Sequence, residues 1–351
     1  MKYVLRPYSV WEIGQRVDAA GNPHQEDSIF PQAGCQTDDD RLFILCDGMG
    51  GHSAGEVASA TVCEALSSNI LGNTEADGIF TEADFASALS AAYDALDAND
   101  NGATKKMGTT LALLKLHSGG YFVAHIGDSR VYHFRPGKTA KDTKIMFRTE
   151  DHSLVNALLK VGELTPEEAK TFKRKNVITR AMQPNGDRRA KADIYQSADI
   201  QAGDYFLLCS DGILEQMDDD DLRQIFSKAG GNDKNKVEKA LREGTVNNRD
   251  NHSAIVVHIY DVDHEEQSAD HSTVVMPQAC GTCRPTETIV HPSPAPKKKR
   301  SAGHSTVVMP ETCRACDATT PIEPQTTLAP KKKMSLWEKI KSKLSGKKNR
   351  P

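Results

Sequence analysis

The sequence predicts an α+β protein in which antiparallel sheets are covered by helices. Three observations lead to this fold class: apolar runs of strand length, amphipathic segments of helical period, and the grouping of the runs into clusters with helices between the clusters. All of these patterns lie before residue 264 of the 351 residues. We therefore predict one folded domain over residues 1–263, followed by a tail.

The predicted strands are short runs rich in Val, Ile, Phe and Tyr that are bounded by Gly, Asp and Ser. Several of them are apolar without alternation, which is typical of strands that are covered on both faces. In chain order they are Leu42–Cys46, Thr110–Leu116, Tyr121–Ile126, Val131–Phe134, Tyr205–Cys209 and Ala254–Ile259.

The predicted helices have apolar side chains at intervals of three and four residues. In the first of them, Val57, Leu66 and Ile70 lie near one stripe, and Thr165-Pro166 is a good start signal for a later one. The predicted helical ranges are 53–71, 82–98, 153–161, 165–175, 218–228 and 233–246.

Charge divides the chain at the same place. Residues 264–351 hold 15 Lys and Arg against 8 Asp and Glu, whereas residues 1–263 hold 29 against 40. The whole chain has a net charge of -4, which excludes a protein that binds nucleic acid along its entire length. A basic tail on an acidic domain indicates contact with an anionic surface or partner.

The tail contains a duplication. The string HSTVVMP occurs at 271–277 and at 304–310, and a Cys-x-x-Cys pair follows each copy. Two copies of a segment rich in Pro, Thr and Lys cannot form a packed core, so we predict a disordered, low-complexity linker over 264–330. A zinc site remains a less favoured alternative, because four thiolates can bind Zn²⁺ tetrahedrally. Its ligands would be Cys280, Cys283, Cys313 and Cys316.

Residues 331–351 form a basic amphipathic segment. Leu336, Trp337, Ile340 and Leu344 fall on one helical stripe among many lysines. Such a segment fits adsorption to an anionic bilayer, docking to a partner, or a solvated tail. The N-terminus shows no signal peptide, and the cysteines of the domain are single, so we expect a cytoplasmic protein, with peripheral binding to the inner membrane face as an alternative.

Acidic residues recur at the ends of the predicted strands, and several stand beside glycine. Oxygen ligands of this kind hold Mg²⁺ or Mn²⁺, and glycine lets a backbone carbonyl approach the ion. Two such ions about 4 Å apart activate a water for attack on phosphorus. Any one Asp-Gly pair is more often a turn, but the whole set favours a metal site. The positions are Glu26, Asp27, Asp47, Asp128, Asp211 and Asp250.

At this point the chain resembles the type 2C metal-dependent serine/threonine protein phosphatase family, in its bacterial form. The resemblance covers roughly residues 8–260, and its motifs occur in the order of the family. They are QEDS (25–28), DGMGGHSAGEVAS (47–59), GTTL (108–111), GDSRVY (127–132), TEDHS (149–153), NVITRA (176–181), SDGI (210–213) and RDNHSAIVV (249–257).

The resemblance implies a four-layer α-β-β-α sandwich of two antiparallel sheets, with a dinuclear centre at one end. Asp47 would bridge both ions, the Gly48 carbonyl would bind one, and Asp211 and Asp250 would bind the other. Asp128 and Asp211 match a third-metal position of bacterial members. Glu26 and Asp27 would hold metal-bound waters, and residues 153–185 would form a mobile flap.

The sequence departs from the family pattern at two positions. Asn22 replaces a phosphate-binding Arg; Arg16 would substitute for it if its loop folds back, and His24 is another candidate. Met49 replaces a His that some members are thought to use as a general acid. His52 is a candidate for that role, although a His there equally suits the start of a helix.

Three further features favour structural interpretations. Arg130 follows a strand-end Asp and is expected to form an ion pair, and His152 is expected to be a satisfied structural histidine. The run Asp218–Asp221 is expected to begin a helix.

These patterns and the resemblance predict a cytoplasmic signalling enzyme, a hydrolase that removes phosphate from phosphoserine and phosphothreonine in proteins modified by a kinase. It would use two or three Mn²⁺ or Mg²⁺ ions and act as a monomer without nucleic acid. The alternative is a weakly active or inactive phosphatase-like module that binds phosphopeptides and recruits partners through its tail. Asn22 favours this alternative, whereas the retained set Asp47, Asp211 and Asp250 speaks against it.

Overall fold

The computed structural model describes residues 1–263 except 19, 51–53, 101, 103–105, 171, 173–176, 187–188 and 231–233. Two antiparallel sheets form its centre. The order in the first sheet is β1 (Lys2–Glu12), β11 (His252–Asp263), β10 (Tyr205–Cys209), β7 (Arg130–Arg135) and β8 (Lys144–Arg148). The order in the second is β2 (Asp27–Phe30), β3 (Leu42–Met49), β5 (Leu111–His117), β6 (Gly120–Ile126) and β9 (Asp193–Ser197), with β4 (Gly108–Thr109) paired to β3.

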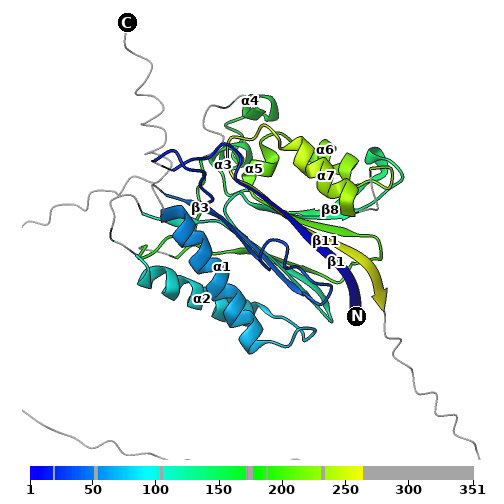
Figure 1. The fold of residues 1–351 in the computed structure, drawn as a ribbon, viewed down its shortest axis with the longest axis horizontal. Coiled ribbons are helices and arrows are strands. Elements are labelled where there is room, and N and C mark those ends of the chain that lie inside the picture. Colours follow the sequence, from blue (N-terminus) through cyan, green and yellow to red (C-terminus); the bar gives the residue numbers. More distant parts are fainter. Residues whose placement is uncertain are drawn as a thin grey trace, which may run out of the picture. The chain divides into compact units, whose positions relative to one another are not determined.

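Helices cover the outer faces of both sheets, as Figure 1 shows. Two long helices, α1 (Ala54–Asn73) and α2 (Glu82–Ala98), pack on the second sheet. The first sheet is covered by α6 (Asp219–Ile225) and α7 (Lys234–Gly244). Three short helices complete the described part of the chain: α3 (Leu154–Lys160), α4 (Pro166–Lys170) and α5 (Asp211–Leu214), besides the 3₁₀ turn Ala140–Asp142.

Three hydrophobic cores separate the four layers. In β3, Ile44 packs toward α1 and α2, while Phe43 and Leu45 pack toward the other sheet. In β10, Phe206 lies between the sheets and Leu207 packs under α6 and α7. Because successive side chains of a strand point to opposite faces, a strand covered on both faces must be apolar at every position. The predicted α-β-β-α sandwich is therefore confirmed.

The predicted strands and helices are all present, with shifted ends. The strand from Leu42 continues through Asp47 to Met49, so Asp47 lies inside β3 rather than after it. The helix predicted over 165–175 is described as Pro166–Lys170, and residues 171 and 173–176 lie outside the described part.

Six elements of the structure were not predicted from the sequence. The strands β8 and β9 are largely half-buried or exposed, so they lack an apolar run, and β2, β4 and α5 are too short for a pattern. A sixth, β1, alternates exposed and buried residues over its first half, which is the period-two pattern of a strand with one covered face.

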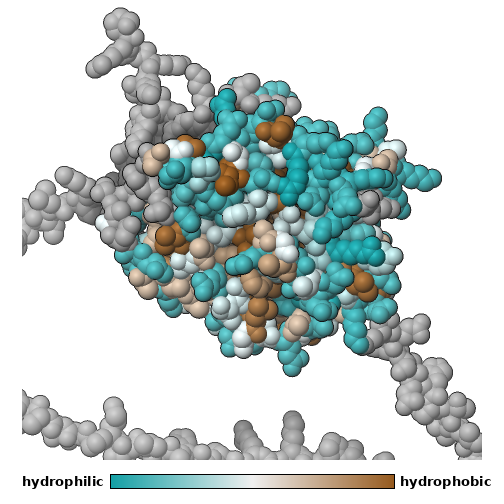
Figure 2. Space-filling model, in the orientation of Figure 1, coloured by the Kyte–Doolittle hydropathy of each residue, from teal (hydrophilic) through white to brown (hydrophobic). Residues whose placement is uncertain are grey.

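Hydrophilic residues cover most of the described surface in the view of Figure 2, with hydrophobic residues scattered between them. Within the described residues, no helix combines the length and the apolar character that crossing a bilayer requires. The predicted linker 264–330, its zinc alternative and the basic segment 331–351 lie outside the described residues, and so does His52. The domain boundary at residue 263 thus stays a prediction.

Candidate active site

An open cleft of about 550 Å³ lies at the end of the sandwich where α3 and α5 are found (Figure 1). Its walls carry the predicted metal ligands Asp128, Asp211 and Asp250 together with Arg16. Asp211 is the first residue of α5, directly after β10, and Asp250 precedes β11. Because β10 and β11 are antiparallel neighbours, the end of one strand lies beside the start of the other.

The pairing of β2 with β3 brings two further carboxylates to this region. Asp27 is the direct partner of Asp47 in the register of the two strands. One oxygen of Asp27 accepts a hydrogen bond of 3.0 Å from Ser210 Oγ, while its Oδ1 is buried without a hydrogen-bond partner. Burial raises the pKa of Asp27 to about 7.

The side chains of Asp47 and Asp211 lie within interaction distance of each other. Neither carboxylate can donate a hydrogen bond when ionised, so their negative charges repel each other. Burial, and then the negative charges of Asp27 and Asp211, raise the pKa of Asp47 well above its usual value. Burial likewise raises the pKa of Asp211 to about 6. The site therefore holds more negative charge than its surroundings balance.

Glycines make room for Glu26 at the back of the cleft. A Cβ atom at Gly55 would lie 2.7 Å from the Glu26 carboxylate, and one at Gly48 would lie 2.2 Å from the Gly55 carbonyl oxygen. The close backbone of Gly55 thus requires a glycine at position 48, whether or not the Gly48 carbonyl also binds an ion. The Gly48 amide also donates to the Glu26 carbonyl at 3.1 Å.

Arg16 reaches the cleft, as the proposed substitution for the missing arginine requires. Its guanidinium donates to Asp250 Oδ1 at 2.5 Å and also bonds the Glu26 carboxylate. The side chain of Asn22 instead donates to Asp18 at 3.1 Å on the exposed loop. His24 Nε2 lies 3.6 Å from Glu26 Oε1. Both candidates are therefore near the carboxylates, and only Arg16 bonds two of them.

Asp128 occupies the turn after β6. It is 7% exposed, and its Oδ1 is buried without a hydrogen-bond partner. Burial, and then the charge of Asp211, raise the pKa of Asp128 to about 7. Next to it, Arg130 bonds both oxygens of Asp151, at 2.6 and 2.7 Å, which confirms the predicted structural ion pair.

Two other structural interpretations are also confirmed. The side chain of Asp218 caps α6 by accepting from the amides of Asp220 and Asp221. The ring of His152 is buried, and both of its nitrogens have hydrogen-bond partners.

The sequence analysis missed a residue that ties the site together. Asn251 accepts from the Glu26 amide at 2.8 Å and donates to the carbonyls of Ile13 and His24 at 2.9 and 2.8 Å. It thereby fixes the loop that carries Arg16 and Glu26 beside Asp250. The sequence analysis selected Asp250 because it is acidic and near a strand end. An uncharged Asn next to it has no feature that would mark it as part of the site.

The donor set of this cleft suits a hard divalent cation. The carboxylates of Asp128, Asp211 and Asp250 line the cleft, and one oxygen of Asp128 is buried without a hydrogen-bond partner. The carboxylates of Asp47 and Asp211 lie close together, and the charge of Asp211 raises the pKa of both Asp47 and Asp128, so positive charge is favoured between them. The residues present therefore fit Mn²⁺ or Mg²⁺.

The fold and the carboxylate-lined cleft define the class of α-β-β-α phosphatases. The profile of the family described as Protein phosphatase 2C matches residues 13–243. The chain belongs to the protein phosphatase 2C family.

Sequence relatives are bacterial phosphatases. The protein phosphatase PhpP of Streptococcus pneumoniae is 35% identical over 188 residues, which cover 53% of this chain and 72% of PhpP. The serine/threonine protein phosphatase PstP of Mycobacterium tuberculosis is 32% identical over 244 residues, covering 69% of this chain and 43% of PstP.

Solved structures agree with the sequence relatives. The crystal structure of PstP/Ppp from Mycobacterium tuberculosis matches with a TM-score of 0.56 and 30% identity, over 74% of this chain and all of that one (100%). The catalytic domain of PstP in complex with two manganese ions matches with a TM-score of 0.57 and 29% identity, over 74% of this chain and 100% of that one.

Proposed function

We propose that the protein hydrolyses phosphoserine and phosphothreonine in proteins and that it requires Mn²⁺ or Mg²⁺. The observation that carries this proposal is the convergence of the carboxylates of Asp128, Asp211 and Asp250, from distant parts of the chain, on one cleft, with a buried and unpaired oxygen at Asp128. The likeness to phosphatases of the same family supports it.

Asp47, Asp211, Asp250 and the Gly48 carbonyl would hold a pair of ions, and Asp128 with Asp211 would hold a third. When bound, such ions supply positive charge to phosphate oxygens and lower the pKa of a water. Glu26, whose amide is held by Asn251, and Asp27, held by Ser210, would orient water from behind these ligands.

Arg16 would bind the phosphate group. Its two terminal nitrogens, which bond Asp250 and Glu26 in this structure, form a fork that suits two oxygens of one phosphate group. Asp250 would serve as a cation ligand, so Arg16 would exchange its bond to Asp250 for one to the phosphate. Arg130 is held on both oxygens of Asp151, so it would shape the cleft wall rather than grip substrate.

Hydrolysis of a small aryl phosphate with Mn²⁺ tests the proposal. The wild type is expected to be active, and Asp211→Asn to lose at least about a hundredfold in kcat, because one ligand is removed. Asp94→Asn is the matched control, since Asp94 pairs with Arg189 on the exposed side of α2. An inactive wild type, or a fully active Asp211→Asn variant, would refute the proposed enzymatic activity.

A phosphopeptide-binding module without turnover is the second candidate. The observation that favours it is the side chain of Asn22, which bonds Asp18 and leaves the cleft without the usual arginine. Binding of a phosphothreonine peptide with Mn²⁺, without release of phosphate over hours, would support this function. Rapid phosphate release would reject it.

We also propose that the enzyme acts in the cytoplasm on substrates of a serine/threonine kinase. The basic residues 331–351 would bring it to anionic membranes. Co-sedimentation with anionic vesicles, for the full chain and for a chain ending at residue 330, tests the second part. Equal binding of the two would reject it.

A further inference from the structure

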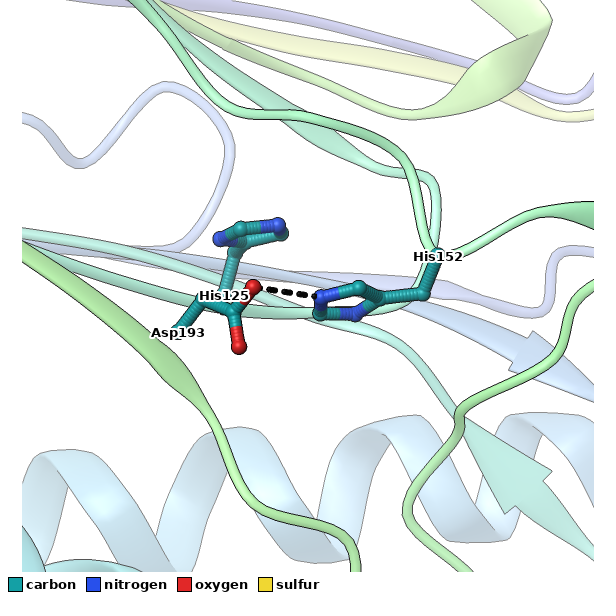
Figure 3. Close-up of side chains that lie close together, drawn as sticks. All are labelled: His125, His152 and Asp193. Atoms are coloured by element: carbon teal, nitrogen blue, oxygen red, sulfur yellow. Dashed lines mark hydrogen bonds and ion pairs between the residues drawn. The ribbon is translucent and has the colours of Figure 1, made fainter. Parts of the chain in front are cut away.

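Two histidines and one aspartate, His125, His152 and Asp193, form a cluster (Figure 3). His125 is in β6, Asp193 begins β9, and His152 precedes α3. One ligand atom from each lies within 4.8 Å of the others. Ligand atoms at this spacing could hold a metal ion of their own.

The ring geometry argues against a shared ion. The two imidazoles are stacked, with centroids 4.6 Å apart and planes at 11°. Because the lone pairs of ring nitrogens lie in the ring plane, two nearly parallel rings direct theirs into separate planes. The nitrogens are also engaged: His125 Nε2 lies 3.0 Å from the Glu150 carbonyl oxygen, and both nitrogens of His152 are bonded. The cluster is better suited to hold His152 in one orientation.

His152 connects this cluster to the turn that carries Asp128. Its Nδ1 accepts a hydrogen bond of 3.0 Å from the Gly127 amide, and its own amide donates to the Gly127 carbonyl at 2.8 Å. Because Nδ1 is the acceptor, Nε2 carries the proton and donates to Asp193 Oδ2 at 3.0 Å (Figure 3). Asp193 is itself held by Arg180 at 2.5 Å.

The opposite side of the same turn is held by Thr110. Its Oγ1 lies 2.7 Å from Ser129 Oγ and accepts from the Asp47 amide at 2.9 Å. Asp128 therefore stands between Gly127, held by His152, and Ser129, held by Thr110. Its carboxylate is buried on the cleft wall with one oxygen unpaired, so its direction is set by the backbone on either side.

We propose that His152 is a positioning residue: fixed by Asp193, its ring holds the Gly127 peptide through Nδ1 and thereby aims Asp128 at a divalent cation that Asp128 shares with Asp211. The inference rests on the proposed function for the identity of that cation. It assigns to His152, which is buried and is not itself a metal ligand, a role in the affinity of the metal position at Asp128 and Asp211.

Two substitutions separate the bonds of His152. In His152→Asn, the amide oxygen takes the place of Nδ1 and can still accept from Gly127, but the side chain is too short to reach Asp193. In His152→Gln, the amide nitrogen takes the place of Nε2 and can donate to Asp193, but Gly127 loses its acceptor. Asn is the smaller residue, so a role in packing alone would make His152→Asn the more damaging change.

The experiment is a manganese titration of the full chain by calorimetry, without substrate. We expect His152→Gln to weaken manganese binding at the position of Asp128 and Asp211 by roughly 10–100-fold, the usual effect of removing a partner behind a metal ligand. His152→Asn should weaken it by no more than about threefold. The Gly127 amide signal in ¹H–¹⁵N spectra should move in His152→Gln and stay near its wild-type position in His152→Asn. Equal effects, or a larger effect in His152→Asn, would overturn the proposal.

Two further variants keep the test decisive. His125→Phe retains a stacked ring and should leave manganese binding unchanged; if it removes a bound ion, the cluster is itself a metal site and the proposal is wrong. Asp193 is exposed, so Asp193→Ala should fold even if His152→Gln does not; it removes the partner of Nε2 and should weaken the same site by about twofold to threefold, as in His152→Asn. An unchanged titration in Asp193→Ala would count against the proposal.

The titration also distinguishes the two levels of inference. A wild type that binds manganese with the expected order among the variants, yet hydrolyses no aryl phosphate or phosphopeptide, would refute the proposed function alone. An active wild type without that order would refute the role of His152 alone.

Discussion

Substitution of Gly127 by alanine tests the geometry of the turn that carries Asp128. Gly127 has a φ of +108°, which side-chain-bearing residues rarely adopt, and a Cβ there would lie 2.6 Å from Thr110 Cγ2. Backbone strain of this kind costs about 1–3 kcal/mol. Forcing a methyl group into a filled space adds about 1–3 kcal/mol. We expect Gly127→Ala to lower the free energy of unfolding by roughly 2–6 kcal/mol.

Gly203 provides the matched control. Its φ is +93°, and nothing lies within 4 Å of the place where a Cβ would stand. Gly203→Ala should therefore show the strain alone, about 1–3 kcal/mol. Urea unfolding at one metal concentration measures both variants. If Gly127→Ala costs no more than Gly203→Ala, the contact with Thr110 does not constrain the turn and the reasoning fails.

A double-mutant cycle identifies the contact. Thr110→Ser removes Cγ2 and keeps the hydroxyl that bonds Ser129 and the Asp47 amide. Part of the loss in Gly127→Ala should return in the double variant, with a coupling of about 1 kcal/mol or more, because residues in contact are not additive. Strict additivity would show that the two side chains do not meet.

Three other predictions concern stability. Lys115→Met removes a buried ammonium whose pKa burial lowers from 10.5 to about 8. Between those pH values the unfolded chain binds more protons than the folded one, so wild-type stability should rise with pH there. The variant should be more stable at pH 7 by on the order of 2–3 kcal/mol, and this advantage should shrink toward pH 10.5; a gap that does not change with pH would refute the account. Thr81→Ala removes the side chain that accepts from the Asp84 amide at the start of α2 and should cost about 1 kcal/mol in urea unfolding, with an unchanged midpoint as the contrary result. Manganese at a hundred times its dissociation constant should stabilise the protein by about 2.7 kcal/mol, reversed by a chelator; equal melting temperatures with and without the ion would contradict a site in the folded state.

The local pattern of the sequence determined the central strands and the long helices. The predicted and observed bounds coincide for β10 at Tyr205–Cys209 and for α2 at Glu82–Ala98. The strand β10 is apolar at every position, and α2 is long enough to show a clear helical period, so each has an unambiguous local pattern. The exposed edge strand β9 had no such pattern, because its pairing with β6 rather than its side chains makes it a strand.

The carboxylates of the site were also visible in the sequence, as acidic residues beside strand ends. Their relative placement was not, because Asp27 meets Asp47 only through the register of β2 with β3, and Asp211 meets Asp250 only through the pairing of β10 with β11. The sequence also showed that Asn22 stands where the family has an arginine. The position of Arg16 could not be predicted, because it depends on a loop that Asn251 holds.

The sequence by itself thus determined which residue types could bind cations and which segments would be buried, since composition and periodicity are local properties. Only the tertiary structure decided that a histidine more than twenty residues along the chain would hold the peptide beside Asp128. Hydrogen bonds between segments distant in the chain depend on how the two sheets pack, and no local pattern encodes that packing.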